Sequence, residues 1–192
     1  MDQGSAAASA SEDVAKREWV NLDSAIKEHA LEEVMVNIGE CAFGDASKIM
    51  MCMGLGSCVG VAIYDSNKKI AGLAHVMLPS KNMFTGEGES PEDMKRFADV
   101  AVPYLVESLL KMGSLRSSML SKISGGAQMF KDSTDELFDV GKRNVLAVKK
   151  QLLDYNIHLV ADDVYGNEGR TIRFVVDTSK MLVRTKNKIA EL

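Results

Sequence analysis

Two apolar runs on either side of one short polar turn restrict the fold of this chain more than any other feature. The first run, CVGVAIYD, occupies residues 58–65, and Val59, Val61 and Ile63 alternate along one side of it. The turn SNKK follows, and the second run, IAGLAHVML, ends at Pro79. Alternating apolar runs of this length, separated by turn-forming residues, are typical of a β-hairpin. The sequence therefore predicts that these two strands are neighbours in one sheet.

Further strand patterns lie on both sides of this hairpin. Two earlier strands are predicted, and with the hairpin they suggest an antiparallel meander; they occupy residues 33–40 and 48–53. Later in the chain, a short strand, a further strand run and a closing hairpin are predicted at residues 121–130, 157–169 and 171–184.

Two helices are predicted among these strands, at residues 90–113 and 141–156. Ser90 is a good N-cap for the first helix, and Pro91 suits its first turn. Strands towards both ends of a domain, with helices between them, indicate a mixed α/β class. We expect a layered sandwich of mostly antiparallel strands with helices packed on it.

The N-terminal segment, residues 1–32, is distinct from residues 33–192, which are predicted to form one domain. Residues 1–12 are small and polar, so disorder is expected there. Residues 13–31 carry apolar side chains near helical spacing, namely Trp19, Leu22, Ile26 and Ala30. This spacing predicts an amphipathic helix. A helix laid on the surface of the domain is favoured over a docking helix for a partner.

The overall composition argues against several classes of function. A net charge of −4 and the lack of any basic run give no electrostatic basis for binding nucleic acid. No apolar stretch approaches the ~18 residues that insertion across a membrane requires, and the N-terminus does not resemble a secretory signal. Three irregularly spaced cysteines do not make a disulfide framework. A reducing cytoplasm is therefore the expected compartment.

Cys58 lies in the glycine-rich stretch GLGSCVG, which does not fit the common cofactor motifs. The stretch departs from G-x-G-x-x-G and is followed by a strand, so a dinucleotide site is not expected, and no phosphate-binding Gly-Lys-Ser/Thr occurs. GSCVG matches a cysteine version of the nucleophile elbow, but that elbow is followed by a helix. The cysteines and His75 lack the spacing of a metal site. The open alternatives are a buried structural thiol and a nucleophile.

The length of the hairpin loop decides whether Cys58 can meet His75. A two-residue loop would place the two residues directly opposite each other, and a four-residue loop would make them diagonal neighbours on one face. An odd loop would place them on opposite faces. With an even loop, a thiolate–imidazolium pair would lower the pKa of the thiol and make Cys58 a nucleophile. A core histidine remains the alternative for His75.

A series of motifs follows in order between residues 34 and 184: GLGSCVGVAIYD, AGLAHVMLP, RFADVAVPYLVESLLKMG, KISGGAQMF, VGKRNV and GNEGR. This series resembles the CheD family of chemoreceptor glutamine deamidases. The resemblance implies a cysteine amidohydrolase of chemotaxis, a protein-glutamine glutaminase that needs no cofactor or metal. It also implies a fold related to the cytotoxic necrotizing factor deamidases.

The resemblance also implies substrates and partners. The family converts selected glutamines on the cytoplasmic helices of methyl-accepting chemotaxis receptors to glutamate, and it has been associated with hydrolysis of glutamyl methyl esters. Some members bind the chemotaxis phosphatase CheC, so a CheC-like partner is expected. The alternative function is a non-catalytic adaptor that binds such a phosphatase or a receptor.

Site residues follow from the same motifs. The family cysteine corresponds to Cys58 and the family histidine to His75. The third catalytic position, commonly threonine, is occupied here by Cys52. Cys52 is interpreted as a small buried residue whose backbone could orient the imidazole; a weakened site and a Cys52–Cys58 redox switch are the alternatives.

Backbone groups near the cysteine complete the predicted site. The N–H groups of Ser57 and Cys58 are expected to stabilise the oxyanion, and Gly56 would let the backbone approach the substrate closely. Gln128 could contact the substrate, although a hydrogen bond within a loop is favoured. For Arg170, in GNEGR, a structural ion pair is expected rather than a contact with an acidic partner.

Overall fold

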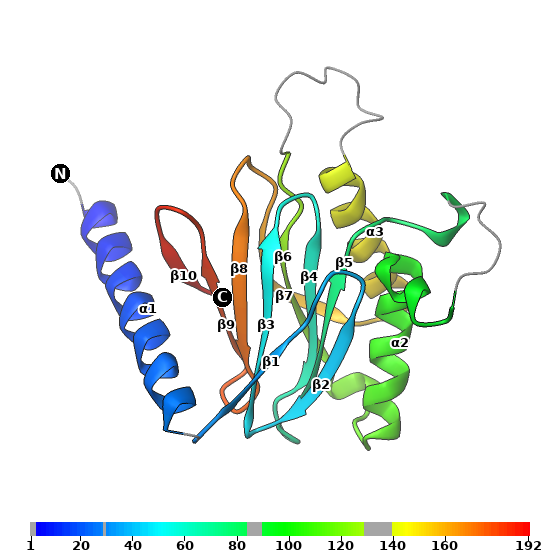
Figure 1. Ribbon diagram of the computed structural model, residues 1–192, viewed down its shortest axis with the longest axis horizontal. Coiled ribbons are helices and arrows are strands. Elements are labelled where there is room, and N and C mark those ends of the chain that lie inside the picture. Colours follow the sequence, from blue (N-terminus) through cyan, green and yellow to red (C-terminus); the bar gives the residue numbers. More distant parts are fainter. Residues whose placement is uncertain (1–2, 29, 84–89, 129–139) are drawn as a thin grey trace.

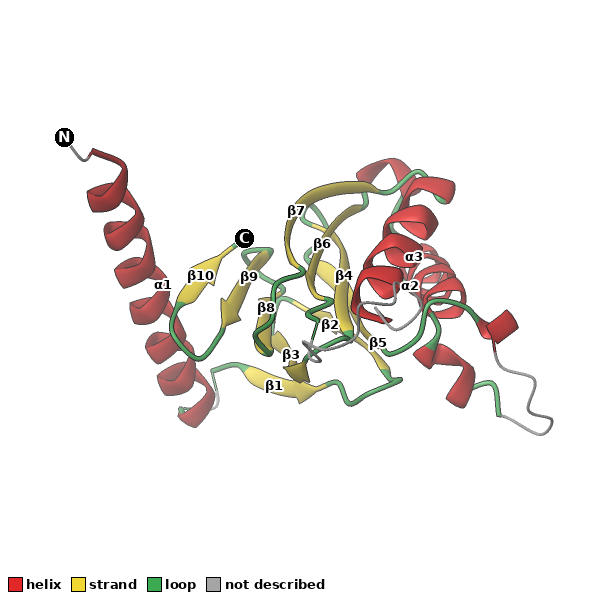
Figure 2. Ribbon diagram, turned by 90° about the horizontal axis from the view of Figure 1, so that it is seen from above, coloured by secondary structure: helices red, strands yellow, loops and turns green. Residues whose placement is uncertain are grey.

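The computed structural model describes residues 3–28, 30–83, 90–128 and 140–192, with side chains from residue 11 onward. In this described part, two five-stranded sheets face each other and three α-helices cover their outer faces (Figure 1). The helices are α1 (Gln3–Lys27), α2 (Ala98–Lys111) and α3 (Val140–Asp154). Figure 2 shows α1 on one side of the sheets, with α2 and α3 on the other. The mixed α/β sandwich predicted from the sequence is confirmed.

The first sheet has the strand order β1-β3-β8-β9-β10 and the second has the order β2-β5-β4-β6-β7. The first comprises β1 (Glu32–Met35), β3 (Lys48–Leu55), β8 (Arg170–Val175), β9 (Lys180–Arg184) and β10 (Ile189–Glu191). The second comprises β2 (Cys41–Asp45), β4 (Val59–Asp65), β5 (Ile70–Val76), β6 (Leu120–Gly125) and β7 (His158–Val164). Neighbouring strands are antiparallel except for the parallel pairs β1–β3 and β6–β7.

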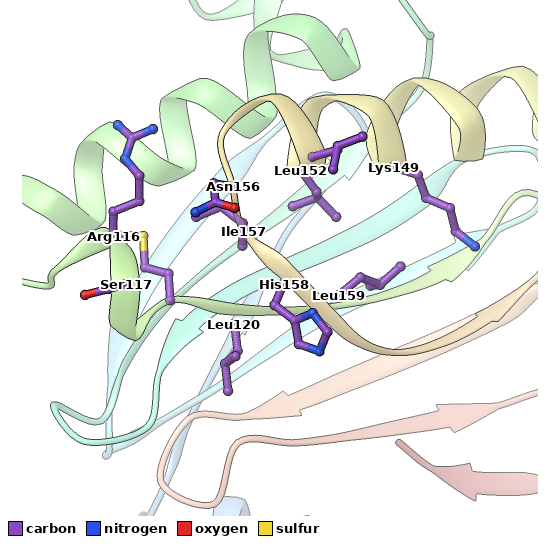
Figure 3. A pocket seen from close by; sticks show the side chains of 11 residues that line it. Arg116, Ser117, Leu120, Lys149, Leu152, Asn156, Ile157, His158 and Leu159 are labelled. Carbon is purple, nitrogen blue, oxygen red and sulfur yellow. The ribbon is translucent and has the colours of Figure 1, made fainter.

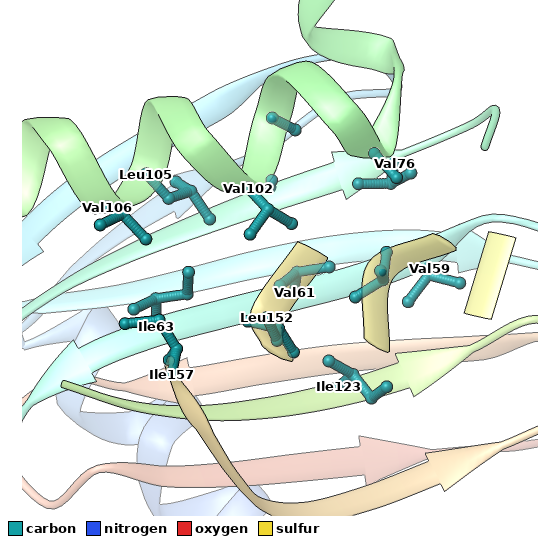
Figure 4. Packing of buried hydrophobic residues seen from close by; sticks show 14 of the residues in the cluster. Val59, Val61, Ile63, Val76, Val102, Leu105, Val106, Ile123, Leu152 and Ile157 are labelled. Carbon is teal, nitrogen blue, oxygen red and sulfur yellow. The ribbon is translucent and has the colours of Figure 1, made fainter. Parts of the chain in front are cut away.

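Within the part of the chain that the structure describes, three apolar cores hold the four layers together. One lies between α1 and the first sheet and contains Trp19, Ile49 and Leu182. The core between the two sheets, here called the inter-sheet core, includes Cys52 and Phe174 among its buried residues. The largest lies between the second sheet and helices α2 and α3 (Figure 4). Alternate residues of β4 therefore face two different cores, as the period-two pattern of a strand requires.

The predicted antiparallel meander is wrong. The strand β3 belongs to the first sheet and β4 to the second, so the chain crosses between the sheets at residues 56–58. Before this crossing, the ladder between β3 and β8 is irregular between Cys52 and Leu55, and Gly54 has a φ of +68°. A bulge with glycine in the left-handed region bends a strand locally. Alternation alone does not reveal to which sheet each strand belongs.

The N-terminal helix starts earlier than predicted. Helix α1 begins at Gln3, so the expected disorder of residues 3–12 is wrong. That stretch is rich in alanine, which has the highest helix propensity. Trp19 and Leu22 of α1 are buried against the first sheet, so this helix packs on the outer face of that sheet.

Other boundaries also differ from the predictions. Ser90 is not the N-cap of the α-helix: it exchanges hydrogen bonds with Asp93 at the start of a 3₁₀ segment, and α2 begins at Ala98. The predicted helix 141–156 corresponds to α3, and strands β2 and β10 were not predicted. The 3₁₀ segments are Lys81–Met83, Asp93–Arg96 and Arg116–Ser118.

Candidate functional site

Cys58 lies where the chain passes from the first sheet to the second. Residues 56–58 form the crossing between β3 and β4, here called the crossing loop. The Cys58 side chain is partly buried and packs against the inter-sheet core. It precedes Gly60 by two positions, so it continues the face of β4 that looks towards the first sheet.

His75 reaches the same face from β5. Strands β4 and β5 pair from Val59–Val76 to Asp65–Ile70, and Gly60 is opposite His75. The loop between them spans residues 66–69, so its length is even. Cys58 is thus the diagonal neighbour of His75 on one face, which is the arrangement expected for a four-residue loop.

The imidazole of His75 is buried and held by one hydrogen bond. Its Nδ1 lies 3.3 Å from the carbonyl oxygen of Val36, and the residue is 1% exposed. A carbonyl oxygen only accepts, so this contact requires the proton on Nδ1. The other nitrogen, Nε2, is buried and has no hydrogen-bond partner among the described residues. In this tautomer, Nε2 carries a free lone pair that can accept a proton.

Burial shifts both groups towards their neutral forms. It raises the pKa of the Cys58 thiol, although the residue's own backbone N–H lowers that pKa in part. Burial also lowers the pKa of His75, against the opposing hydrogen bond to Val36. A desolvated site disfavours charge. Both shifts therefore disfavour the expected thiolate–imidazolium pair and favour a neutral thiol and a neutral imidazole at diagonal positions on the two strands.

The crossing loop is tied down through its carbonyl oxygens. The N–H of Ala127 donates to the Gly56 oxygen over 2.8 Å, and the N–H of Gly126 donates to the Cys58 oxygen over 2.8 Å. The oxygen of Ser57, between them, accepts from a side chain of α3 over 2.9 Å. The N–H groups of Ser57 and Cys58 donate to no acceptor among the described residues. These are the two groups expected to form an oxyanion hole.

Cys52 takes no part in the hydrogen bond that holds the imidazole of His75. It is fully buried in the inter-sheet core, and its backbone pairs with Ile172 of β8. Burial strongly raises the pKa of its thiol. The Val36 carbonyl, and not that of Cys52, contacts His75. The carbonyl that holds the imidazole thus belongs to Val36, the residue after β1, where the Cys52 backbone was expected.

A cavity of about 450 Å³ adjoins the crossing loop. Its lining residues are Gly126, Gln128, Lys142, Tyr165, Gly166 and Asn167. The backbone N–H of Gln128 donates to the Gly166 oxygen over 2.8 Å, so this residue takes part in a loop hydrogen bond. Gln128 thus lines this cavity, and it follows Ala127, which bonds to the crossing loop.

Arg170 is a structural residue, as predicted. It is 7% exposed and pairs with Asp163 over 3.3 Å. Its guanidinium also donates to the backbone carbonyl oxygen of Glu168 over 2.9 Å.

A second cavity, of about 550 Å³, lies at the far end of the second sheet (Figure 3). It is lined by Leu120 and His158, which are paired at the start of β6 and β7. Strand β6 runs antiparallel to β4, so Leu120 lies opposite Tyr64, whereas Gly125 lies opposite Val59 near the crossing loop. This cavity is therefore separated from Cys58 by the length of the sheet.

Other kinds of site are not found in the described residues. They contain no cluster of three or more histidine, cysteine, aspartate or glutamate side chains suited to a metal ion. None of the described helices combines the length and apolarity needed to cross a membrane.

Sequence reasoning missed two residues that shape this site. Val36 was placed in a strand, but nothing in its type or spacing indicated a carbonyl directed at an imidazole. Asn144, which supplies the bond to Ser57, belongs to the quoted motif VGKRNV but had no assigned role. A polar residue within the apolar face of a predicted helix was the signal that could have found it.

Comparison with known proteins connects this geometry to a family. A family model described as "CheD chemotactic sensory transduction" matches residues 77–185. A Clostridium novyi protein named "Probable chemoreceptor glutamine deamidase CheD" is 39% identical over 155 residues, covering 80% of this chain and 93% of that protein. A Clostridium botulinum protein of the same name is 39% identical over 156 residues, covering 81% and 94%.

The chain belongs to the CheD family. The resemblance in the ordered motifs is thereby confirmed, and with it membership of a family of chemoreceptor glutamine deamidases. Among solved structures, a Neisseria meningitidis protein of family DUF152 matches with a TM-score of 0.43 and 9% identity, covering 76% of this chain and 69% of that one.

Proposed function

We propose that this chain is a protein-glutamine glutaminase that converts glutamine side chains of chemoreceptors to glutamate, with Cys58 as the nucleophile. The observation that carries the proposal is the diagonal relation of Cys58 to His75 across β4 and β5, on one face. Among the described residues, Nε2 of His75 has no hydrogen-bond partner. The names of the relatives support the reaction and the substrate class.

The reaction starts from the neutral pair. Sγ of Cys58 attacks the side-chain carbonyl carbon of glutamine while its proton passes to Nε2 of His75. The N–H groups of Ser57 and Cys58 stabilise the oxyanion of the tetrahedral intermediate. Imidazolium then protonates the departing ammonia, which leaves a thioester between Cys58 and the receptor. His75 finally activates water, whose attack releases glutamate and restores the thiol.

The same residues account for a second reaction. A glutamyl methyl ester would give the same thioester with loss of methanol, so hydrolysis of such esters is part of the proposal. The substrate approaches along Gly56, and Gln128 contributes at the rim of the neighbouring cavity.

The setting of the enzyme is proposed from the family. Its substrates are the cytoplasmic helices of methyl-accepting receptors, and it acts in the cytoplasm. A CheC-like phosphatase is the proposed regulatory partner. Residues 33–192 form the deamidase domain, related in fold to the cytotoxic necrotizing factor deamidases, and residues 1–32 are an extension of it.

The test compares Cys58→Ala with Cys41→Ala. Both variants remove one thiol, and Cys41 is partly buried in β2 on the side of α2. Ammonia release from a fragment of a receptor's cytoplasmic helices should fall to background in Cys58→Ala and persist in Cys41→Ala. Persistence of ammonia release in Cys58→Ala would refute the assignment.

The second candidate is a non-catalytic adaptor, because a buried cysteine replaces the threonine common at position 52. Binding of a CheC-like phosphatase or a receptor fragment by the wild-type chain, without ammonia release from any fragment, would favour it. If Cys58→Ala abolishes deamidation and leaves binding intact, the chain is an enzyme that also binds partners.

A further inference from the structure

Asn144 is a fully buried polar residue that joins the two halves of the site. It lies in α3, and its side-chain nitrogen Nδ2 donates two hydrogen bonds. One goes to the backbone carbonyl oxygen of Ser57 over 2.9 Å and the other to the backbone carbonyl oxygen of Met77 over 2.8 Å. Ser57 precedes Cys58, and Met77 follows His75 by two residues. One amide group thus bonds to the backbone next to the predicted nucleophile and to the backbone near the predicted base.

The side-chain amide of Asn144 lies just beyond the end of the β4–β5 ladder. The pairing of β4 with β5 ends at Val59–Val76 near the crossing loop. Beyond this pair, the carbonyl oxygens of Ser57 and Met77 are both acceptors, so they cannot bond to each other. An amide NH₂ has two hydrogens and can satisfy both. Asn144 therefore extends the hairpin's hydrogen bonding to the residues beside Cys58.

Helix α3 holds this amide in a fixed place. Gly141, three residues earlier, packs so closely on the chain that an added Cβ would lie 2.7 Å from the oxygens of Gly126 and Ala127. Those two residues are the ones whose N–H groups hold Cys58 and Gly56. The start of α3, residues 126–127 and the crossing loop thus form one connected unit.

We propose that Asn144 is a positioning residue for deamidation, which sets the approach of Sγ of Cys58 to Nε2 of His75 by holding the Ser57 and Met77 carbonyls. This inference rests on the proposed function of the pair. A displacement of about 1 Å between reacting groups can cost on the order of 100-fold in rate. Neither hydrogen bond involves the substrate, so the effect falls on kcat and leaves KM nearly unchanged.

The experiment compares three variants of Asn144 with one matched control. Asn144→Asp keeps the shape and replaces the donors by acceptors, Asn144→Ala removes both donors, and Asn144→Ser is the mildest change. Val148→Ala is the control, because Val148 is a buried residue one turn further along α3 that packs in the core between α3 and the second sheet. All four are measured for thermal unfolding and for kcat and KM on a receptor fragment.

A second measurement does not depend on deamidation. Alkylation of Cys58 by iodoacetamide is followed against pH, and peptide mass mapping separates it from Cys41 and Cys52. In Asn144→Ala, the rate at pH 7 should fall because His75 no longer receives the thiol proton. The rate should recover at high pH, where the thiol ionises without a base. Val148→Ala should unfold at a lower temperature but keep the wild-type kcat and alkylation profile.

We expect kcat to fall on the order of 100-fold in Asn144→Ala and Asn144→Asp, and less in Asn144→Ser. The inference is overturned if the folded Asn144 variants keep the wild-type kcat and alkylation profile. It is also overturned if Val148→Ala loses as much kcat, for a given loss of stability, as the Asn144 variants do. A wild-type chain that releases no ammonia, but whose Cys58 alkylation still depends on Asn144, would refute the proposed function and retain the positioning role.

Discussion

Cys58 and His75 differ from an ion-paired cysteine site in their resting charge. Burial raises the pKa of the thiol and lowers that of the imidazole, so both are neutral near pH 7. The free lone pair on Nε2 then matters more than a preformed thiolate, because the proton has to move during the attack. A neutral cysteine is also less open to adventitious oxidation than a thiolate.

The first prediction concerns the pH dependence of deamidation. Because the pKa of His75 is lowered from 6.5, its basic form persists at mildly acidic pH. The value of kcat/KM should therefore rise through an apparent pKa below 6.5 and then stay level into the alkaline range, since the thiol's pKa is raised. Initial rates of ammonia release between pH 5 and 9 measure this profile. A midpoint at or above 6.5 would contradict a neutral buried imidazole.

The second prediction concerns stability at His75. A lowered pKa means that the unfolded chain binds more protons below pH 6.5 than the folded chain does. The stability that the neutral imidazole contributes is thus present above pH 6.5 and is lost as pH falls through the folded pKa. The difference in unfolding free energy between the wild type and His75→Gln should shrink over that range. Urea unfolding at several pH values tests this, and a difference independent of pH would contradict it.

The third prediction concerns Cys52. His75 bonds to the Val36 carbonyl, so Cys52→Ala should keep a wild-type kcat while losing roughly 1 kcal/mol of unfolding free energy from the buried side chain. Cys52→Thr tests whether a hydroxyl improves the orientation, which would appear as a rise in kcat. A collapse of activity in both variants would mean that the thiol itself is required. The Cys52–Cys58 redox switch stays a prediction, and both thiols are free in this structure.

At the scale of elements, the end of β6 packs directly against the crossing loop. Gly125 has a φ of +122°, and an added Cβ would lie 2.2 Å from the Cys58 carbonyl oxygen. That oxygen also accepts the hydrogen bond from Gly126. The backbone of β6 and the crossing loop therefore touch directly, and no side chain fits between them.

The fourth prediction follows from this contact. Gly125→Ala should displace Cys58, destabilise the chain by about 1–3 kcal/mol and reduce kcat more than the loss of stability explains. Gly113→Ala is the matched control, because Gly113 also has a positive φ, of +92°, but the nearest atom to its added Cβ is a lysine nitrogen at 3.7 Å. Stability should fall in both variants and activity of the folded protein only in Gly125→Ala. Equal loss of activity in the two would disprove a local effect.

At the scale of the whole molecule, the layers separate the N-terminal helix from the site. Trp19 of α1 packs on the outer face of the first sheet, whereas Cys58 contacts the inner face. Arg173 stacks on Trp19 at 4.4 Å and pairs with Asp23 over 2.7 Å and Glu33 over 2.8 Å. The helix is thus attached by an apolar core together with a buried arginine.

The fifth prediction tests this separation. Trp19→Ala should cost about 3–5 kcal/mol of unfolding free energy, because it removes a large buried side chain from that core. The kcat of the folded variant should equal that of the wild type, since the opposite face of the sheet holds the site. Val20→Ala, at a position 61% exposed on the same helix, is the control and should change neither quantity. A fall in kcat with Trp19→Ala alone would link α1 to the site.

Much of this protein follows from its sequence alone. The alternation of residues in the two runs made the meeting of Cys58 and His75 depend only on the length of the loop between them, since side-chain direction in a strand has a period of two. The structure supplied that length, which is four residues. The ordered motifs likewise suffice to identify the family. These features are local, so they do not depend on how the sheets are assembled.

Only the tertiary structure decided the environment of the pair. The bond from His75 to Val36, the clamp by Asn144 and the crossing between two sheets all join residues far apart in the chain. The neutral charge state depends on burial between two layers, which alternation does not reveal. The sequence by itself determined which residues can meet, and the packing of the layers decided their hydrogen bonds and protonation, because both depend on what surrounds them in space.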